Sequence, residues 1–120
     1  MTLKKTLQDT IPIRDKGGEV YILLSPKNTQ NEKMIMGYAR TPVGETVKEH
    51  RHPESEECFF VIEGEGKVFL EDGRVICFCK NEAIRIPQNM KHTIKNTGKT
   101  ELCVVFASGP LAKTMELGHA

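Results

Sequence analysis

The chain has 120 residues, and its 17 lysines and arginines nearly balance 16 aspartates and glutamates, which leaves a formal net charge of +1. This length fits a single domain with a modest core. The balanced charge argues against a nucleic-acid-binding protein, which normally carries a basic excess on one face. No apolar run approaches a membrane span, and the first residues lack the apolar segment of a secretory signal. We therefore expect a cytoplasmic protein that binds neither nucleic acid nor membrane.

The N-terminal half predicts an arm followed by short strands. Residues 1–19 mix charged and apolar side chains and predict an arm, with an edge strand at Ile11–Ile13, because Pro12 cannot donate a hydrogen bond to a neighbouring strand. Glycines and prolines separate the next apolar segments, as is typical of strands joined by turns. The expected elements are strands at Val20–Leu24, Lys33–Thr41 and Thr46–His52, and a loop at Asn28–Asn31.

The C-terminal half continues this pattern. Asp72-Gly73 is typical of a tight hairpin with a type I′ turn, which needs positive φ at both central residues. Sustained helical periodicity is absent, although the last dozen residues could form a short helix. Many short, regularly spaced strands predict an all-β domain, which we place at residues 20–108, before a tail at residues 109–120. The expected strands are Glu57–Glu63, Lys67–Glu71, Arg74–Cys79, Ala83–Ile86, His92–Asn96 and Leu102–Ala107.

Three histidines and a glutamate predict a metal site. Alternate side chains of a strand share a face, so His50 and His52 can point at one spot. Glu57 opens the next apolar segment, where a second strand could bring a carboxylate back, and His92 lies far downstream. This ligand set suits one divalent ion per chain, such as Zn, Mn, Fe or Ni, with coordination positions left for a ligand.

These residues carry a resemblance to the cupin superfamily, whose motifs read G-x5-H-x-H-x4-E-x6-G and G-x5-P-x-G-x2-H-x3-N. The first motif fits from Gly44 through the histidines and Glu57 to Gly64. The second fits at Pro87, His92 and Asn96, but its glycines are replaced by Asn81 and Asn89, and asparagine tolerates the left-handed conformation of such turns. The resemblance implies a jelly-roll, or double-stranded β-helix, barrel with the metal held by His50, His52, Glu57 and His92.

A narrower likeness concerns substrate class. The segments Tyr21–Lys27 and Ser55–Val61 and the ending from Gly109 are similar to the small cupins of aromatic polyketide pathways, of the tetracenomycin, spore-pigment and resistomycin types. That group includes a zinc-dependent polyketide cyclase. The likeness implies an enzyme that acts on a β-dicarbonyl-like small molecule through its metal. A dioxygenase or decarboxylase with the same ligands, and a non-catalytic module that binds a small molecule, remain alternatives.

Several polar residues near the motifs have more than one interpretation. Glu56 competes with Glu57 as the ligand, but the motif spacing favours Glu57. Arg85 either lines the cavity or lies at the surface. Candidates for further polar groups in the cavity are Tyr38, Arg40 and Lys48.

The remaining apolar residues and the thiols give two further expectations. We predict that the four cysteines, Cys58, Cys77, Cys79 and Cys103, are reduced and mostly buried. If Glu57 points inward, Phe60 and Ile62 point outward, so the outer face of this strand also needs a cover. A neighbouring strand, the N-terminal arm or a second subunit could provide it, and we favour a homodimer, partly because the resemblance to small cupins implies such pairing.

Overall fold

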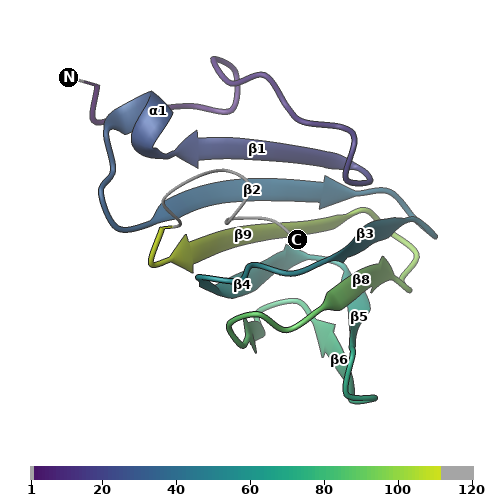
Figure 1. The fold of residues 1–120 in the computed structure, drawn as a ribbon. Helices are drawn as coiled ribbons and strands as arrows, with labels where there is room; N and C mark the ends of the chain where they lie inside the picture. Colours follow the sequence, from purple (N-terminus) through teal and green to yellow (C-terminus); the bar gives the residue numbers. More distant parts are fainter. Residues whose placement is uncertain (1, 112–120) are drawn as a thin grey trace.

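The computed structural model describes residues 2–111. Within them, nine strands form two antiparallel sheets that face each other, and one short helix follows the first strand (Figure 1). The five-stranded sheet has the order β1-β2-β9-β4-β7, and the four-stranded sheet the order β3-β8-β5-β6. This arrangement confirms the all-β prediction. No helix in the described part of the chain is long and apolar enough to cross a membrane.

The expected strands are present with small changes at their ends. Ile11–Ile13 forms only a single bridge, from Ile13 to Val20, instead of an edge strand. The segment after β1 holds a one-turn helix, which begins because the Ser25 side chain accepts a hydrogen bond from the Asn28 N–H. The possible C-terminal helix lies outside the described residues. The elements are β1 (Glu19–Leu24), α1 (Pro26–Thr29), β2 (Ile35–Thr41), β3 (Thr46–His50), β4 (Glu56–Glu63), β5 (Glu65–Leu70), β6 (Val75–Cys79), β7 (Ala83–Ile86), β8 (His92–Asn96) and β9 (Leu102–Gly109).

The core lies between the two sheets and follows the alternation of side chains along the strands. On β4, Phe59 and Val61 are buried, whereas Phe60 and Ile62 on the other face are exposed. Each side chain buried in this way contributes about 1.5–3 kcal/mol. The buried cluster comprises Phe59, Val61, Val68, Leu70, Phe78, Ile86, Leu102 and Val104.

The four turn positions of the two motifs all have left-handed backbone. Gly44 and Gly64 have φ values of 78° and 93°, and Asn81 and Asn89 have values of 71° and 61°. The asparagines therefore adopt the conformation that glycine would supply, as their ability to occupy this region predicts. The replacement of glycine leaves the second motif intact as a structural unit.

The β5–β6 hairpin is present, but the predicted turn type was wrong. Only Gly73 has positive φ, so the turn is not type I′, which also requires it at Asp72. The Gly73 N–H donates to the Leu70 carbonyl at 3.0 Å, and the Leu70 N–H donates to the Arg74 carbonyl at 2.9 Å. This is the pattern of a turn followed by a left-handed glycine, the longer hairpin alternative. The Asp72 carboxylate stabilises it by accepting from the Arg74 N–H at 3.1 Å.

The expected burial of the thiols was wrong for three of the four cysteines. All four are free, but Cys58, Cys77 and Cys79 are exposed, and Cys103 is buried. Cys77 and Cys79 flank the buried Phe78 on β6, so alternation turns both of them outward. Because both faces of β6 carry apolar residues, the sequence does not show on which face its cysteines lie.

The left-handed turns give a test of stability at Asn81, which is exposed and remote from the histidines. Asn81→Ala should lower the free energy of unfolding by about 1–2 kcal/mol, because alanine is strained at positive φ, and this corresponds to several degrees in melting temperature. Asn81→Gly is the matched control, since glycine adopts this conformation without strain and should stay near wild-type stability. Urea denaturation of the three proteins measures the difference. Equal stability of the alanine and glycine variants would contradict the argument.

Candidate metal centre

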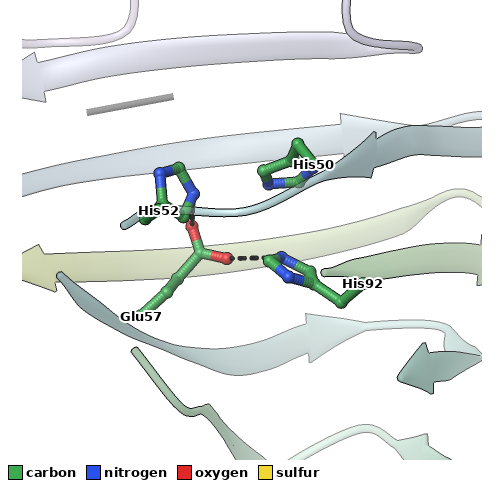
Figure 2. A group of neighbouring side chains, drawn as sticks. All are labelled: His50, His52, Glu57 and His92. Carbon is green, nitrogen blue, oxygen red and sulfur yellow. Dashed lines mark ion pairs between the residues drawn. The ribbon is translucent and has the colours of Figure 1, made fainter. Parts of the chain in front are cut away.

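The four predicted ligands lie together between the two sheets (Figure 2). His50 ends β3 and His92 begins β8, and the two residues are directly paired across these strands. Glu57 reaches toward them from β4 of the facing sheet. The site therefore exists only because the two sheets are packed face to face.

His52 reaches the cluster by a different route from the predicted one. The strand ends at His50, so His52 lies in the loop after it, and the register shifts between Val47 and His50. The loop is held by the His52 carbonyl, which accepts hydrogen bonds from Asn89 N–H at 2.9 Å and Ser55 N–H at 3.4 Å. Strand alternation therefore predicted correctly that His50 and His52 lie close together, although His52 is in a loop and not in the strand.

The distances within the cluster suit a single ion. One ligand atom from each residue can be chosen so that all four lie within 4.8 Å of one another. Glu57 Oε2 lies 3.6 Å from His52 Nε2, and Glu57 Oε1 lies 3.4 Å from His92 Nε2. Because metal–nitrogen and metal–oxygen bonds are about 2.0–2.2 Å long, a small contraction would place an ion within reach of all four.

Backbone carbonyls orient two of the imidazoles. His50 Nδ1 lies 2.8 Å from the Lys48 carbonyl, and His92 Nδ1 lies 2.9 Å from the Met90 carbonyl. A carbonyl only accepts, so each Nδ1 carries the hydrogen and each Nε2 presents a lone pair to the cluster. His92 Nε2 is fully buried and makes no hydrogen bond within residues 2–111. A buried lone pair of this kind fits a metal ion, which would satisfy it.

The cluster carries negative charge on Glu57. Burial by itself would raise the pKa of this carboxyl, but contacts with His52 and His92, whose rings attract the carboxylate when they are protonated, outweigh burial and lower the pKa to about 2. Burial lowers the pKa of His50, which favours its neutral, metal-binding form. A carboxylate with neutral imidazoles suits Zn, Mn, Fe or Ni, and the ligand types alone do not select among them.

The other candidate residues lie outside the cluster. Glu56 and Arg85 form an exposed ion pair at 2.7 Å, so Arg85 is at the surface. Tyr38 and Arg40 do not line the cavity as predicted, because β2 turns them to the outer face, where the Arg40 guanidinium lies 5.6 Å from the centre of the Tyr38 ring. The Lys48 side chain is exposed, and this residue serves the site only through its carbonyl.

Sequence reasoning also missed some residues that surround the site. The carbonyl groups of Lys48 and Met90 come from the backbone, so no side-chain pattern could have identified them. Each lies two residues before its histidine, which is the local signal that exists. Ser108, a buried residue of β9 paired with Glu57, was missed because its direction depends on the strand register.

Metal binding can be tested with a pair of adjacent carboxylates. Purified wild-type protein should bind one divalent ion per chain, and Glu57→Gln should bind much less, because the cluster loses its only anionic ligand. Glu56→Gln removes the same charge from the preceding residue, which lies at the surface, and should keep full occupancy. Elemental analysis after dialysis gives the stoichiometry. A His50→Ala, His92→Ala double variant that still binds one ion would refute the ligand assignment.

Comparison with known proteins identifies the family of this chain. A family model described as "Cupin domain" matches residues 37–108. The chain is 38% identical over 108 residues to "Polyketide synthase CurC" of Streptomyces cyaneus, covering 90% of this chain and 70% of that protein. It is 32% identical over 116 residues to "Tetracenomycin polyketide synthase protein TcmJ" of Streptomyces glaucescens, covering 97% and 77%. It is also 29% identical over 92 residues to the "Oxalate-binding protein" of Thermotoga maritima, covering 75% of each.

Solved structures support the fold alone. An uncharacterised protein with a double-stranded β-helix domain from Klebsiella pneumoniae superposes with a TM-score of 0.77 at 15% identity, covering 100% of this chain and 96% of that chain. Pac13 from Streptomyces, described as a nucleoside dehydratase, gives a TM-score of 0.81 at 13% identity, covering 100% and 90%. These likenesses show the barrel fold, and the fold alone does not determine the activity of this chain.

Proposed function

We propose, since this chain belongs to the cupin family, that it is a metal-dependent small-molecule enzyme of the polyketide-cyclase type. Its substrate would be a β-dicarbonyl compound bound at one divalent ion held by His50, His52, Glu57 and His92. The observation that carries the proposal is the geometry of this ligand set, in which one carboxylate and oriented imidazoles converge between the sheets. The relatives named after polyketide synthases support the substrate class.

The charge and the walls of the site suit an enolised dicarbonyl. A divalent ion with a single carboxylate ligand keeps net positive charge, which favours an anionic ligand. When bound, such an ion supplies Lewis acidity that lowers the pKa of a coordinated carbon acid. The inner faces beside the ligands carry apolar side chains, among them the buried Ile86, which is directly paired with Glu57.

The alternatives differ in the step after binding. A dioxygenase or decarboxylase, or a non-catalytic binding module, could use the same four ligands. The relative named as an oxalate-binding protein supports the binding module. Oxalate and an enolised β-dicarbonyl each present two oxygens to a metal, so these functions require the same binding mode and are separated by turnover.

Acetylacetone tests the proposed binding mode. The protein loaded with Zn or Ni should bind it as the enolate, giving a shift of the ligand's own absorption with Zn or a new absorption band with Ni. The complex should disappear with a chelator and in Glu57→Gln, and it should persist in Glu56→Gln. An oligo-β-ketone should then be consumed faster by metal-loaded than by metal-free protein. Coordination without consumption across Zn, Mn, Fe and Ni would favour the binding module, and absence of both would remove the polyketide proposal.

The outer face of the five-stranded sheet supports a homodimer, which we propose as the functional form. Phe60 and Ile62 of β4 are 39% and 42% exposed, and Met36 of the same sheet is 39% exposed. The charged residues around this patch are already paired within the chain, Arg85 with Glu56 and Arg40 with Glu101. An apolar patch with a neutralised border suits a second copy of the chain better than a charged partner.

The dimer can be tested with two phenylalanines of matched exposure. Phe60→Asp should shift the mass in analytical ultracentrifugation from dimer to monomer, because it places a charge in the proposed interface. Phe69→Asp is the control, since Phe69 is 40% exposed but belongs to the four-stranded sheet. Wild-type protein that sediments as a monomer, or equal effects of the two variants, would contradict the proposal.

A cytoplasmic location is part of the same proposal. Three exposed free thiols support it, because such groups persist in reducing compartments and are prone to oxidation or pairing elsewhere. The small-molecule ligand is then a metabolite of that compartment.

A further inference from the structure

We propose that Ser108 is a substrate-positioning residue, whose hydroxyl donates a hydrogen bond to an oxygen of the ligand held at the metal centre. This inference rests on the proposed function. Ser108 belongs to β9 and is directly paired with Glu57 of β4. Residues paired in this way share a face, with their Cβ atoms about 4.5–5.5 Å apart. Because Glu57 points into the site, Ser108 points into it as well.

The surroundings of Ser108 are apolar. Its other partner in the sheet is Ile35, and on the far side of Glu57 lies the buried Ile86. Ser108 is only 8% exposed, yet its side chain makes no hydrogen bond within residues 2–111. The oxygens of Glu57 contact His52 and His92 instead. The Ser108 hydroxyl is not among the fully buried polar atoms of the described residues, so it keeps access to the cavity and can donate to a ligand there.

A ligand with anionic oxygens would need a hydrogen-bond donor in this site. An enolate offers oxygens that accept hydrogen bonds, and the carboxylate of Glu57 can only accept. The Nδ1–H groups of His50 and His92 already donate to the carbonyls of Lys48 and Met90. The Ser108 hydroxyl is therefore the donor that the inner face of β9 offers beside the metal ligand Glu57.

The chain provides a matched control in Thr41. Thr41 is also a buried residue, and its hydroxyl also makes no hydrogen bond in the described part of the chain. Thr41 pairs with Leu102 at the opposite end of β9 from Ser108, about 20 Å away along the strand. Thr41→Val therefore removes a buried hydroxyl from the same inner face without touching the site.

The test compares two probes on Ni-loaded protein. Acetylacetone offers two oxygens, whereas azide binds the metal through one nitrogen and serves as a probe of the ion itself. Ser108→Ala should weaken acetylacetone about 10- to 150-fold, the effect of losing a hydrogen bond to a charged acceptor, and leave azide affinity and metal content unchanged. Thr41→Val should change neither affinity, and Ser108→Thr, which keeps the hydroxyl, should restore acetylacetone binding.

The outcomes separate this inference from the proposed function. If wild-type protein binds azide but not acetylacetone, the proposed function fails, and the role of Ser108 fails with it. If wild-type protein binds both probes and Ser108→Ala binds acetylacetone equally well, only the role of Ser108 is refuted. Equal losses for both probes in Ser108→Ala would assign Ser108 to the structure of the metal centre and also overturn the proposal.

Discussion

The contact of Glu57 with His92 of the facing sheet and with His52 of the loop after β3 is the constraint on which the site depends. Glu57 lies 3.4 Å from His92 and 3.6 Å from His52 across the interior of the barrel. These groups can meet only where the two sheets approach, and a carboxylate is buried there at a cost that the imidazoles offset. The apolar cluster on the same inner faces fixes the spacing between the sheets, so packing and ligand geometry are determined together.

The turns determine which strands meet at this contact. Gly64 ends β4, and Asn81 and Asn89 flank β7, so left-handed residues border two neighbouring strands of the five-stranded sheet. The Asn89 N–H donates to the His52 carbonyl, which ties the loop before His92 to the loop that carries another ligand. The family motif is thus a set of backbone conformations as much as a set of ligands, and this explains why asparagine can replace its glycines.

The strands could be predicted from the sequence because side-chain alternation is local, and alternation also brought His50 and His52 together. The choice of Glu57 and the place of His92, far downstream, rested on the resemblance to the cupin motifs. The face of the sheet on which a side chain lies after a turn could not be predicted in this way. Arg85 had two interpretations until the register placed it opposite Cys58 on the outer face. Tyr38 and Arg40 were candidates for the cavity, and the register of β2 places them on the outer face instead. The type of the turn at Asp72-Gly73 and the position of His52 in a loop also depend on local geometry that residue types do not determine.

The site combines a strong means of holding a ligand with few groups free to move protons. His50 and His92 use their Nδ1–H groups to fix their own orientation, and Glu57 remains ionised among the imidazoles. With a metal bound, such a centre could bind two-oxygen ligands whether or not it transforms them, and the names of similar chains, polyketide synthase and oxalate-binding protein, differ accordingly. We therefore expect activity in this family to depend on the side chains that line the cavity beside the ligands. The ligands themselves would be occupied in holding the metal.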